Sequence, residues 1–260
     1  MALAGRWDID FHLPPEGIKH FPRGVLKRVD EVADIIKLKR DPGKKPEELF
    51  QYIDIASVDV STGVVINPQE LTGEEAPSRA RKVVRAFDLI VSTCRPTRGA
   101  IAVIPVSLHN QIASTAFSIV RAHEDINPFY LHYALRLPST LEQFRKWSTG
   151  SSYPAILDED VKKTLIPVPE IQIQDTIAKR IITALNERDR IIQTANMQWN
   201  DALDSITKAL VNSEILSEII IKTEGIYTAE EIKVKLLELP PIPTDAPNDN
   251  LDLFAEAESE

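Results

Sequence analysis

The chain has 260 residues, of which 43% are hydrophobic and 27% are charged, and its formal net charge at pH 7 is −9. This length suffices for one large domain or two modest ones with a buried core. The single cysteine, Cys94, excludes an internal disulfide framework and a cysteine-rich zinc site, and is typical of a reducing compartment. Because no long apolar run occurs, we expect neither a secretory signal nor a membrane helix, and we expect a cytoplasmic protein.

The negative charge is concentrated at one end of the sequence. Residues 213–260 contain twelve acidic and three basic side chains, which give this segment a net charge of −9. The other 27 acidic and 27 basic residues therefore balance over residues 1–212. An acidic protein ordinarily makes a poor partner for nucleic acid, but here that argument applies only to the last segment.

Residues 1–168 show the mixed patterning of an α/β (α+β) domain. Alternating and β-branched runs predict two strands within 50–60 and 63–68, joined by a turn at residues 61–63, and further strands within 81–93, 99–106 and 115–122. Residues 127–147 have apolar side chains at helical spacing and predict two helices broken near Pro138 and Ser139. Asn127 is the expected N-cap of the first helix, with Pro128 in its first turn.

The second region, residues 169–216, predicts one long helix of the coiled-coil type. No glycine or proline interrupts residues 171–216, and apolar residues recur there at steps of three and four. A core helix of a globular domain is the alternative, but a helix of roughly 60 Å exceeds the diameter of a small domain. We therefore expect a dimer or partner interface formed by Ile177, Ile181, Ala184, Ile191, Ala195, Trp199, Ala202 and Ile206.

The third region, residues 217–260, predicts a short helix followed by a disordered acidic tail. Thr228 is the expected N-cap of that helix. From about residue 240 onward, proline, acidic and small polar residues dominate, which is a composition that cannot bury a core.

Several catalytic motifs are absent or incomplete. Residues 127–130, N-P-F-Y, resemble the N-P-P-Y motif of amino-methyltransferases, but the second proline and a glycine-rich turn for the methyl donor are missing. No phosphate-binding G-x-x-x-x-G-K-[ST] occurs, and the five histidines lack metal-ligand spacing. The loop S-T-G-S-S-Y-P-A-I lacks the G-x-S-x-G elbow of a nucleophilic serine. We therefore expect no catalytic residue, no metal site and no cofactor bound by this chain.

A basic cluster lies between residues 78 and 98, where six cations face a single acid, Asp88. In an extended strand Arg79, Arg81 and Arg85 share one face, which favours contacts with phosphate oxygens. The alternative is a strand edge kept basic to prevent aggregation. The nearby hydroxyl-rich loop adds hydrogen-bond donors for phosphate. The expected DNA-binding residues are Ser78, Arg79, Arg81, Lys82, Arg85, Arg95, Arg98, Thr149, Gly150, Ser151, Ser152 and Tyr153.

The order of the motifs resembles a known family. Y-I-D-I-A-S-V-D, A-P-S-R-A-R-K-V-V-R-A-F-D-L-I-V-S-T-C-R-P, Q-I-A-S-T-A-F-S-I-V-R, I-N-P-F-Y-L, S-T-G-S-S-Y-P-A-I and I-P-V-P-E-I-Q-I-Q-D-T-I-A follow one another. This series, over residues 6–210, closely resembles the DNA target recognition domain and following helix of type I restriction–modification specificity subunits.

The resemblance implies a non-catalytic subunit that reads one half of a split site in double-stranded DNA. Its long helix would serve as a spacer and contact methyltransferase (modification) subunits, which bind S-adenosylmethionine and methylate adenine. A restriction subunit, where present, would cut DNA with ATP and Mg²⁺. The residues that contact base edges vary within the family, so the recognised sequence does not follow from the resemblance.

The chain departs from the family pattern because it has one recognition domain and one long helix instead of two of each. The simplest interpretation is a half-subunit that forms a homodimer through antiparallel helices. A truncated remnant, or a half that pairs with a different half, is the alternative. A coiled-coil scaffold protein that kept the fold and lost DNA binding is the rival function.

Overall fold

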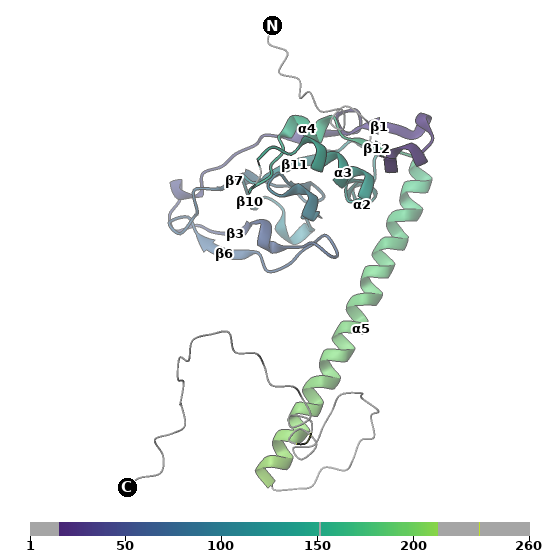
Figure 1. Cartoon of the computed structure of the whole chain (residues 1–260). Helices are drawn as coiled ribbons and strands as arrows, with labels where there is room; N and C mark the ends of the chain where they lie inside the picture. Colours follow the sequence, from purple (N-terminus) through teal and green to yellow (C-terminus); the bar gives the residue numbers. More distant parts are fainter. Residues whose placement is uncertain (1–15, 151, 213–233, 235–260) are drawn as a thin grey trace, which may run out of the picture. The chain divides into compact units, whose positions relative to one another are not determined.

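The computed structural model describes residues 16–150, 152–212 and 234 (Figure 1). The chain divides into two units, Met1–Met197 and Gln198–Glu260, with the boundary inside the helix α5. The predicted helix at Thr228 and the acidic tail lie outside the described residues, and the boundaries at residues 168 and 216 stay predictions. Within the described ranges, no helix is long and apolar enough to cross a membrane.

The strands and helices alternate in short segments through the first unit, and α5 follows them. The strands are β1 (Leu26–Arg28), β2 (Ala33–Ile36), β3 (Leu49–Ile53), β4 (Val58–Asp59), β5 (Val64–Val65), β6 (Gln69–Thr72), β7 (Ala80–Val83), β8 (Leu89–Ser92), β9 (Ile101–Val103), β10 (Ile112–Ser114), β11 (Phe117–Ala122) and β12 (Leu165–Pro167). The helices are α2 (Pro128–Leu135), α3 (Pro138–Trp147), α4 (Asp158–Lys162) and α5 (Ile171–Asn212).

Two four-stranded sheets organise the domain. One has the order β2-β11-β8-β9 and is antiparallel throughout. The other has the order β6-β3-β10-β7, in which only β3 and β10 run parallel. The chain passes between the two sheets at β7 to β8 and again at β10 to β11, so the sheets are joined by short connections. Two small ladders, β1-β12 and β4-β5, complete the pairing among the described strands.

The sheet that contains β8 and β11 is buried on both faces. Leu89 and Val91 of β8 pack with Leu131 of α2 and Phe144 of α3 in one hydrophobic cluster. The intervening residue, Ile90, belongs to a second cluster with side chains of β3 and β10. Because successive strand residues point to opposite faces, this alternation places helices on one side of the sheet and the second sheet on the other.

The fold confirms the expected α+β domain followed by a long helix. The turn at residues 61–63 joins β4 to β5, and α2 and α3 separate immediately before Pro138. Asn127 caps α2, because its side-chain oxygen accepts hydrogen bonds from Phe129 N at 2.9 Å and Tyr130 N at 3.2 Å. Three strands, β1, β2 and β6, were not predicted, since their short runs mix apolar and charged residues.

Candidate nucleic-acid interface

The predicted basic cluster is divided between a strand and the turns that flank it. Strand β7 contains Arg81 and Lys82, whereas Arg79 precedes it and Arg85 follows it. The strand register also shifts opposite β7, between Ala113 and Ser114. The prediction that Arg79, Arg81 and Arg85 share one strand face is therefore wrong, because the strand is too short to contain all three.

Two of the predicted cations are held within the domain. Arg81 donates from Nη1 to the carbonyl oxygen of Ala80 at 2.8 Å, and its Nη2 lies 3.5 Å from a carboxylate oxygen of Asp41. Lys82 is half-buried and donates from Nζ to the carbonyl oxygen of Phe117 at 2.5 Å. Burial lowers the pKa of Lys82. These contacts tie β7 to its neighbours and leave these two cations less accessible to a ligand.

The single acid of the cluster is removed from the surface. Asp88 is fully buried and accepts two hydrogen bonds from Arg121, at 2.7 and 2.8 Å. Its carboxylate also accepts one from Arg85 N at 2.8 Å. The side chains of Arg79, Arg85 and Arg98 are exposed, and none forms an ion pair with a residue that the structure describes. The surface is therefore more cationic than the sequence count implies.

The hydroxyl-rich loop forms a closed turn beside Arg95. Thr149 and Ala155 exchange two backbone hydrogen bonds of 2.9 Å, and Arg95 N donates to the carbonyl oxygen of Pro154 at 2.7 Å. Gly150 has a φ of +91°, and a Cβ there would lie 3.0 Å from the carbonyl oxygen of Tyr153, so the turn requires glycine. Ser151 lies outside the described residues.

Tyr153 and Arg95 form a stacked pair at this loop. The Arg95 guanidinium carbon lies 5.0 Å from the centroid of the Tyr153 ring. Tyr153 is 71% exposed, which is unusual for a large aromatic side chain that contacts its own domain. This pair presents a cation and a ring face together at the surface.

A short turn connects the loop to the start of β7. Thr115 N donates to the carbonyl oxygen of Arg79 at 2.9 Å, and Thr93 N donates to that of Ala116 at 2.8 Å. Cys94 in turn bridges to Ala155. The structure thus brings Arg79, Arg95 and the loop into one neighbourhood, although they are separated by up to about seventy residues in the sequence.

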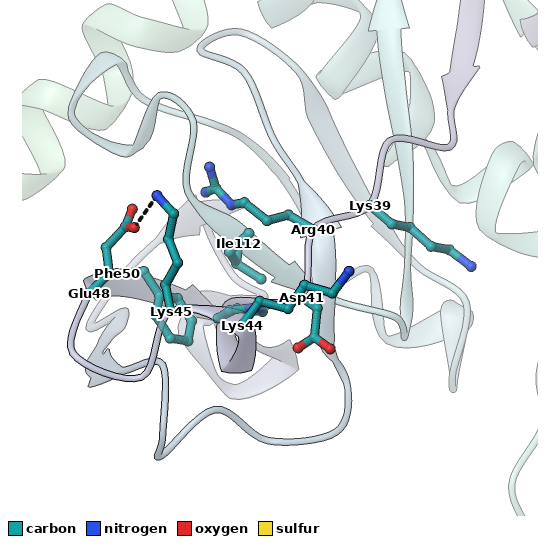
Figure 2. Close-up of a pocket in the computed structure, with 9 residues that line it drawn as sticks. Lys39, Arg40, Asp41, Lys44, Lys45, Glu48, Phe50 and Ile112 are labelled. Carbon is teal, nitrogen blue, oxygen red and sulfur yellow. Dashed lines mark ion pairs between the residues drawn. The ribbon is translucent and has the colours of Figure 1, made fainter.

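The prediction missed a second basic segment, K-L-K-R-D-P-G-K-K at residues 37–45. It lies along the outer edge of β7, where Arg40 N donates to the carbonyl oxygen of Arg81 at 2.9 Å and Val83 N donates to that of Leu38 at 3.1 Å. Five of its nine residues are basic, a density that exceeds that of residues 78–98 and was visible in the sequence. Figure 2 shows the side chains of this segment.

The predicted interface on α5 begins inside the domain. Gln174 and Ala178 are buried, and Ile177 packs partly against the domain core. Ile181 is half-buried. Farther along, the exposed predicted residues are Ala184, Ile191, Ala195, Trp199, Ala202 and Ile206. The first turn of the predicted interface therefore contacts this chain's own core.

The titratable residues with the largest pKa shifts have structural partners. Burial lowers the pKa of His132 to about 4, and its Nε2 lies 3.0 Å from the carbonyl oxygen of Ile101. Hydrogen bonds from Thr62 and Ser61 lower the pKa of Asp59 to about 2, which fixes the turn between β4 and β5. Over the described part of the chain, no group of three or more His, Cys, Asp or Glu residues is placed to hold a metal ion.

Together these features define a class of protein: a mixed-sheet recognition domain with exposed cations and hydroxyl groups, joined to a long helix. The family model of the type I restriction modification DNA specificity domain matches residues 25–198. Because that match covers more than half of the sequence, the chain belongs to this family.

Individual relatives agree with the family. The type I restriction enzyme HindI specificity subunit of Haemophilus influenzae is 28% identical over 164 residues, which are 60% of this chain and 35% of that protein. The HsdS subunit of Thermoanaerobacter tengcongensis is 31% identical with a TM-score of 0.56, over 80% of this chain and 52% of that one. A chain from a solved type I R-M system is 33% identical with a TM-score of 0.57, over 77% of this chain and 51% of that one. This chain therefore spans about half of the solved chains and about a third of the curated relative.

Proposed function

We propose that this chain is a sequence-specific DNA-binding specificity subunit of a type I restriction–modification complex and reads one half of a bipartite site. The observation that carries the proposal is the exposed cationic surface around Arg79, Arg85 and Arg95 on a domain of the DNA specificity family. The chain itself is not an enzyme. Methyltransferase subunits bind S-adenosylmethionine and methylate adenine, and a restriction subunit, where present, uses ATP and Mg²⁺, all in the cytoplasm.

The chemistry of this surface suits the DNA backbone. Guanidinium groups form charge-assisted, bidentate hydrogen bonds with phosphate oxygens. The exposed hydroxyl groups of Thr149 and Ser152 add neutral donors beside Arg95. Contacts of this kind set the affinity and the register of the domain on the duplex, whereas contacts with base edges set the sequence preference.

The test is the salt dependence of binding to duplex DNA, measured by fluorescence anisotropy for the full chain with and without methyltransferase subunits. We expect affinity to fall steeply with salt, and the double variant Arg79→Ala with Arg85→Ala to reduce the slope of log K against log salt by about 2. The matched control replaces Lys179 and Arg180, which are exposed on α5, with alanine. Absence of salt-sensitive binding with the partners supplied would favour the scaffold function instead.

The hydroxyl-rich loop has a separate test. Replacing Ser151 and Ser152 with alanine is expected to weaken DNA binding while the unfolding midpoint of the domain stays unchanged. Unaltered binding would assign the loop a purely structural role, as the turn between α3 and α4. The conservative variant Ser152→Thr, which keeps the hydroxyl group, serves as the control.

We also propose that two copies of the chain pair through α5, which would supply the second recognition domain of a complete site. Ile191 is 55% exposed and Trp199 is 64% exposed, and such large apolar side chains on one long helix favour helix pairing. Sedimentation equilibrium should give the mass of a dimer. Charged replacements of Ile181 and Ile191 should give the mass of one chain, and a monomeric wild-type chain would exclude the homodimer.

A further inference from the structure

A cavity opens beside β7, in the basic segment that the sequence prediction missed. Its volume is about 290 Å³, and it is lined by Lys39, Arg40, Asp41, Pro42, Lys44, Lys45, Glu48, Phe50 and Ile112. Figure 2 shows this arrangement, with Glu48 and Lys45 joined as an ion pair. This volume is close to the lower end of the range for small-ligand sites, about 300 Å³.

The cavity has a cationic rim because its two acids already have partners. Glu48 accepts from Lys45, with 2.6 Å between the carboxylate oxygen and Nζ. Asp41 accepts from Gly43 N at 3.1 Å and lies 3.5 Å from Arg81. The ammonium groups of Lys39 and Lys44 form no ion pair with any residue that the structure describes, so their charges are available to a ligand.

Arg40 is fixed in place at the same rim. Its Nη1 donates to Oδ1 of Asn110 at 3.1 Å, and its Nη2 donates to the carbonyl oxygen of Asn110 at 2.6 Å. Both acceptors are neutral, so these bonds orient the guanidinium without cancelling its charge. A guanidinium held in this way loses little side-chain entropy when it meets an anion.

The floor of the cavity is apolar. Phe50 and Ile112 belong to a hydrophobic cluster beneath the second sheet and are buried, and Pro42 closes one wall. A bare inorganic anion would gain nothing from such a floor. An anion attached to an apolar body would place its charge at the rim and its body against Phe50 and Ile112.

We propose that this cavity is a sugar–phosphate subsite for the DNA backbone, in which Lys39, Arg40 and Lys44 contact a phosphate and the deoxyribose packs over Phe50 and Ile112. The assignment rests on the proposed DNA-binding function and adds a contact outside residues 78–98. Its position along β7 supports it, because Arg40 is hydrogen-bonded to Arg81 of the predicted cluster. The DNA surface then extends across the outer edge of the second sheet.

The test compares salt slopes for binding of a fluorescein-labelled duplex by three forms of the full chain, with and without methyltransferase subunits. The variant Lys39→Ala with Lys44→Ala should bind roughly tenfold more weakly, and its slope should be smaller by about 2, the change expected for two lost phosphate contacts. The control, Lys179→Ala with Lys208→Ala, removes the same charge from exposed positions on α5 and should keep the wild-type slope. Both variants should unfold at the wild-type urea midpoint, since the replaced ammonium groups have no intrachain ion pair.

Each outcome separates this subsite from the broader function. If the wild-type chain binds DNA and the Lys39 and Lys44 variant keeps the slope of the control, the subsite is overturned and the proposed function stands. If the wild-type chain does not bind DNA, both fail. A further titration uses inorganic phosphate and deoxyribose 5-phosphate without DNA, and saturable micromolar binding of either one, abolished in the variant, would replace the DNA backbone with a small phosphate ligand.

Discussion

The first turns of α5 and the turns that follow differ in what covers them. Gln174 is 1% exposed and Ala178 is 2% exposed, and both contact the domain that precedes the helix. Ile191, farther along the same helix, is 55% exposed although its side chain is larger and more apolar. Size and hydrophobicity alone would predict the reverse burial. The beginning of α5 is thus part of the domain core, and its middle is a surface that folding of this domain does not need.

The packed turns should be the most sensitive part of the helix. Replacing Ala178 with aspartate places a charge in a buried position without a partner, and we expect a loss of about 3 kcal/mol in the free energy of unfolding. Urea denaturation followed by tryptophan fluorescence measures it. The matched control is Ala184→Asp, the same change at an exposed position on the same helix. Equal losses in both variants would show that the two regions do not differ in packing.

Acid should weaken the packed region through His132. Burial lowers its pKa to about 4, whereas the unfolded value is about 6.5, so the unfolded chain binds more protons between these two values. The stabilisation is complete above pH 6.5 and is lost as the pH falls toward 4. At pH 5 this amounts to about 2 kcal/mol relative to pH 7.

The variant His132→Gln isolates that contribution to the pH dependence. It has no imidazole to protonate, so its unfolding free energy should change less between pH 7 and pH 5 than that of the wild-type chain. Urea titrations at both pH values measure the difference. A variant with the wild-type pH dependence would assign the acid sensitivity to other groups.

Gln174 should have a smaller effect. Its Oε1 accepts from Asn127 N at 3.0 Å, and its Nε2 donates to the carbonyl oxygen of Pro169 at 2.8 Å, so it links the start of α5 to the N-cap of α2. Gln174→Ala leaves both backbone groups without these partners and should cost about 1–2 kcal/mol in urea denaturation. The control Gln193→Ala, at an exposed position on α5, should change the stability by less than about 0.5 kcal/mol.

Much of the fold could be predicted from local patterns, and the details of the site depend on long-range contacts. The helix break before Pro138 and the cap at Asn127 follow from residues close in sequence, and both were predicted correctly. The internal use of Lys82 could not be predicted, because its acceptor, the carbonyl oxygen of Phe117, is thirty-five residues away.

The same holds for the two basic segments. Residues 37–45 lie beside β7 only because the chain leaves β2 and runs along the edge of the other sheet. Their density of basic residues was visible in the sequence, but their proximity to Arg81 was not. Similarly, the spacing of apolar residues on α5 identified the helix, but could not show that Ile177 packs against its own domain.

The smallest effect on stability is expected at the exposed surface of α5, and it gives the sharpest test of the contrast along the helix. Ile191→Asp removes a side chain that is 55% exposed, so the unfolding free energy of the domain should change by less than about 0.5 kcal/mol. If α5 pairs with a second copy, the same substitution should nevertheless lower the solution mass from that of a dimer to that of one chain. The control is Gln193→Asp, a charge added two residues away without loss of an apolar side chain. A domain destabilised by Ile191→Asp as strongly as by Ala178→Asp would mean that this part of α5 also belongs to the folded core, because an exposed helix surface cannot transmit such a loss to the domain.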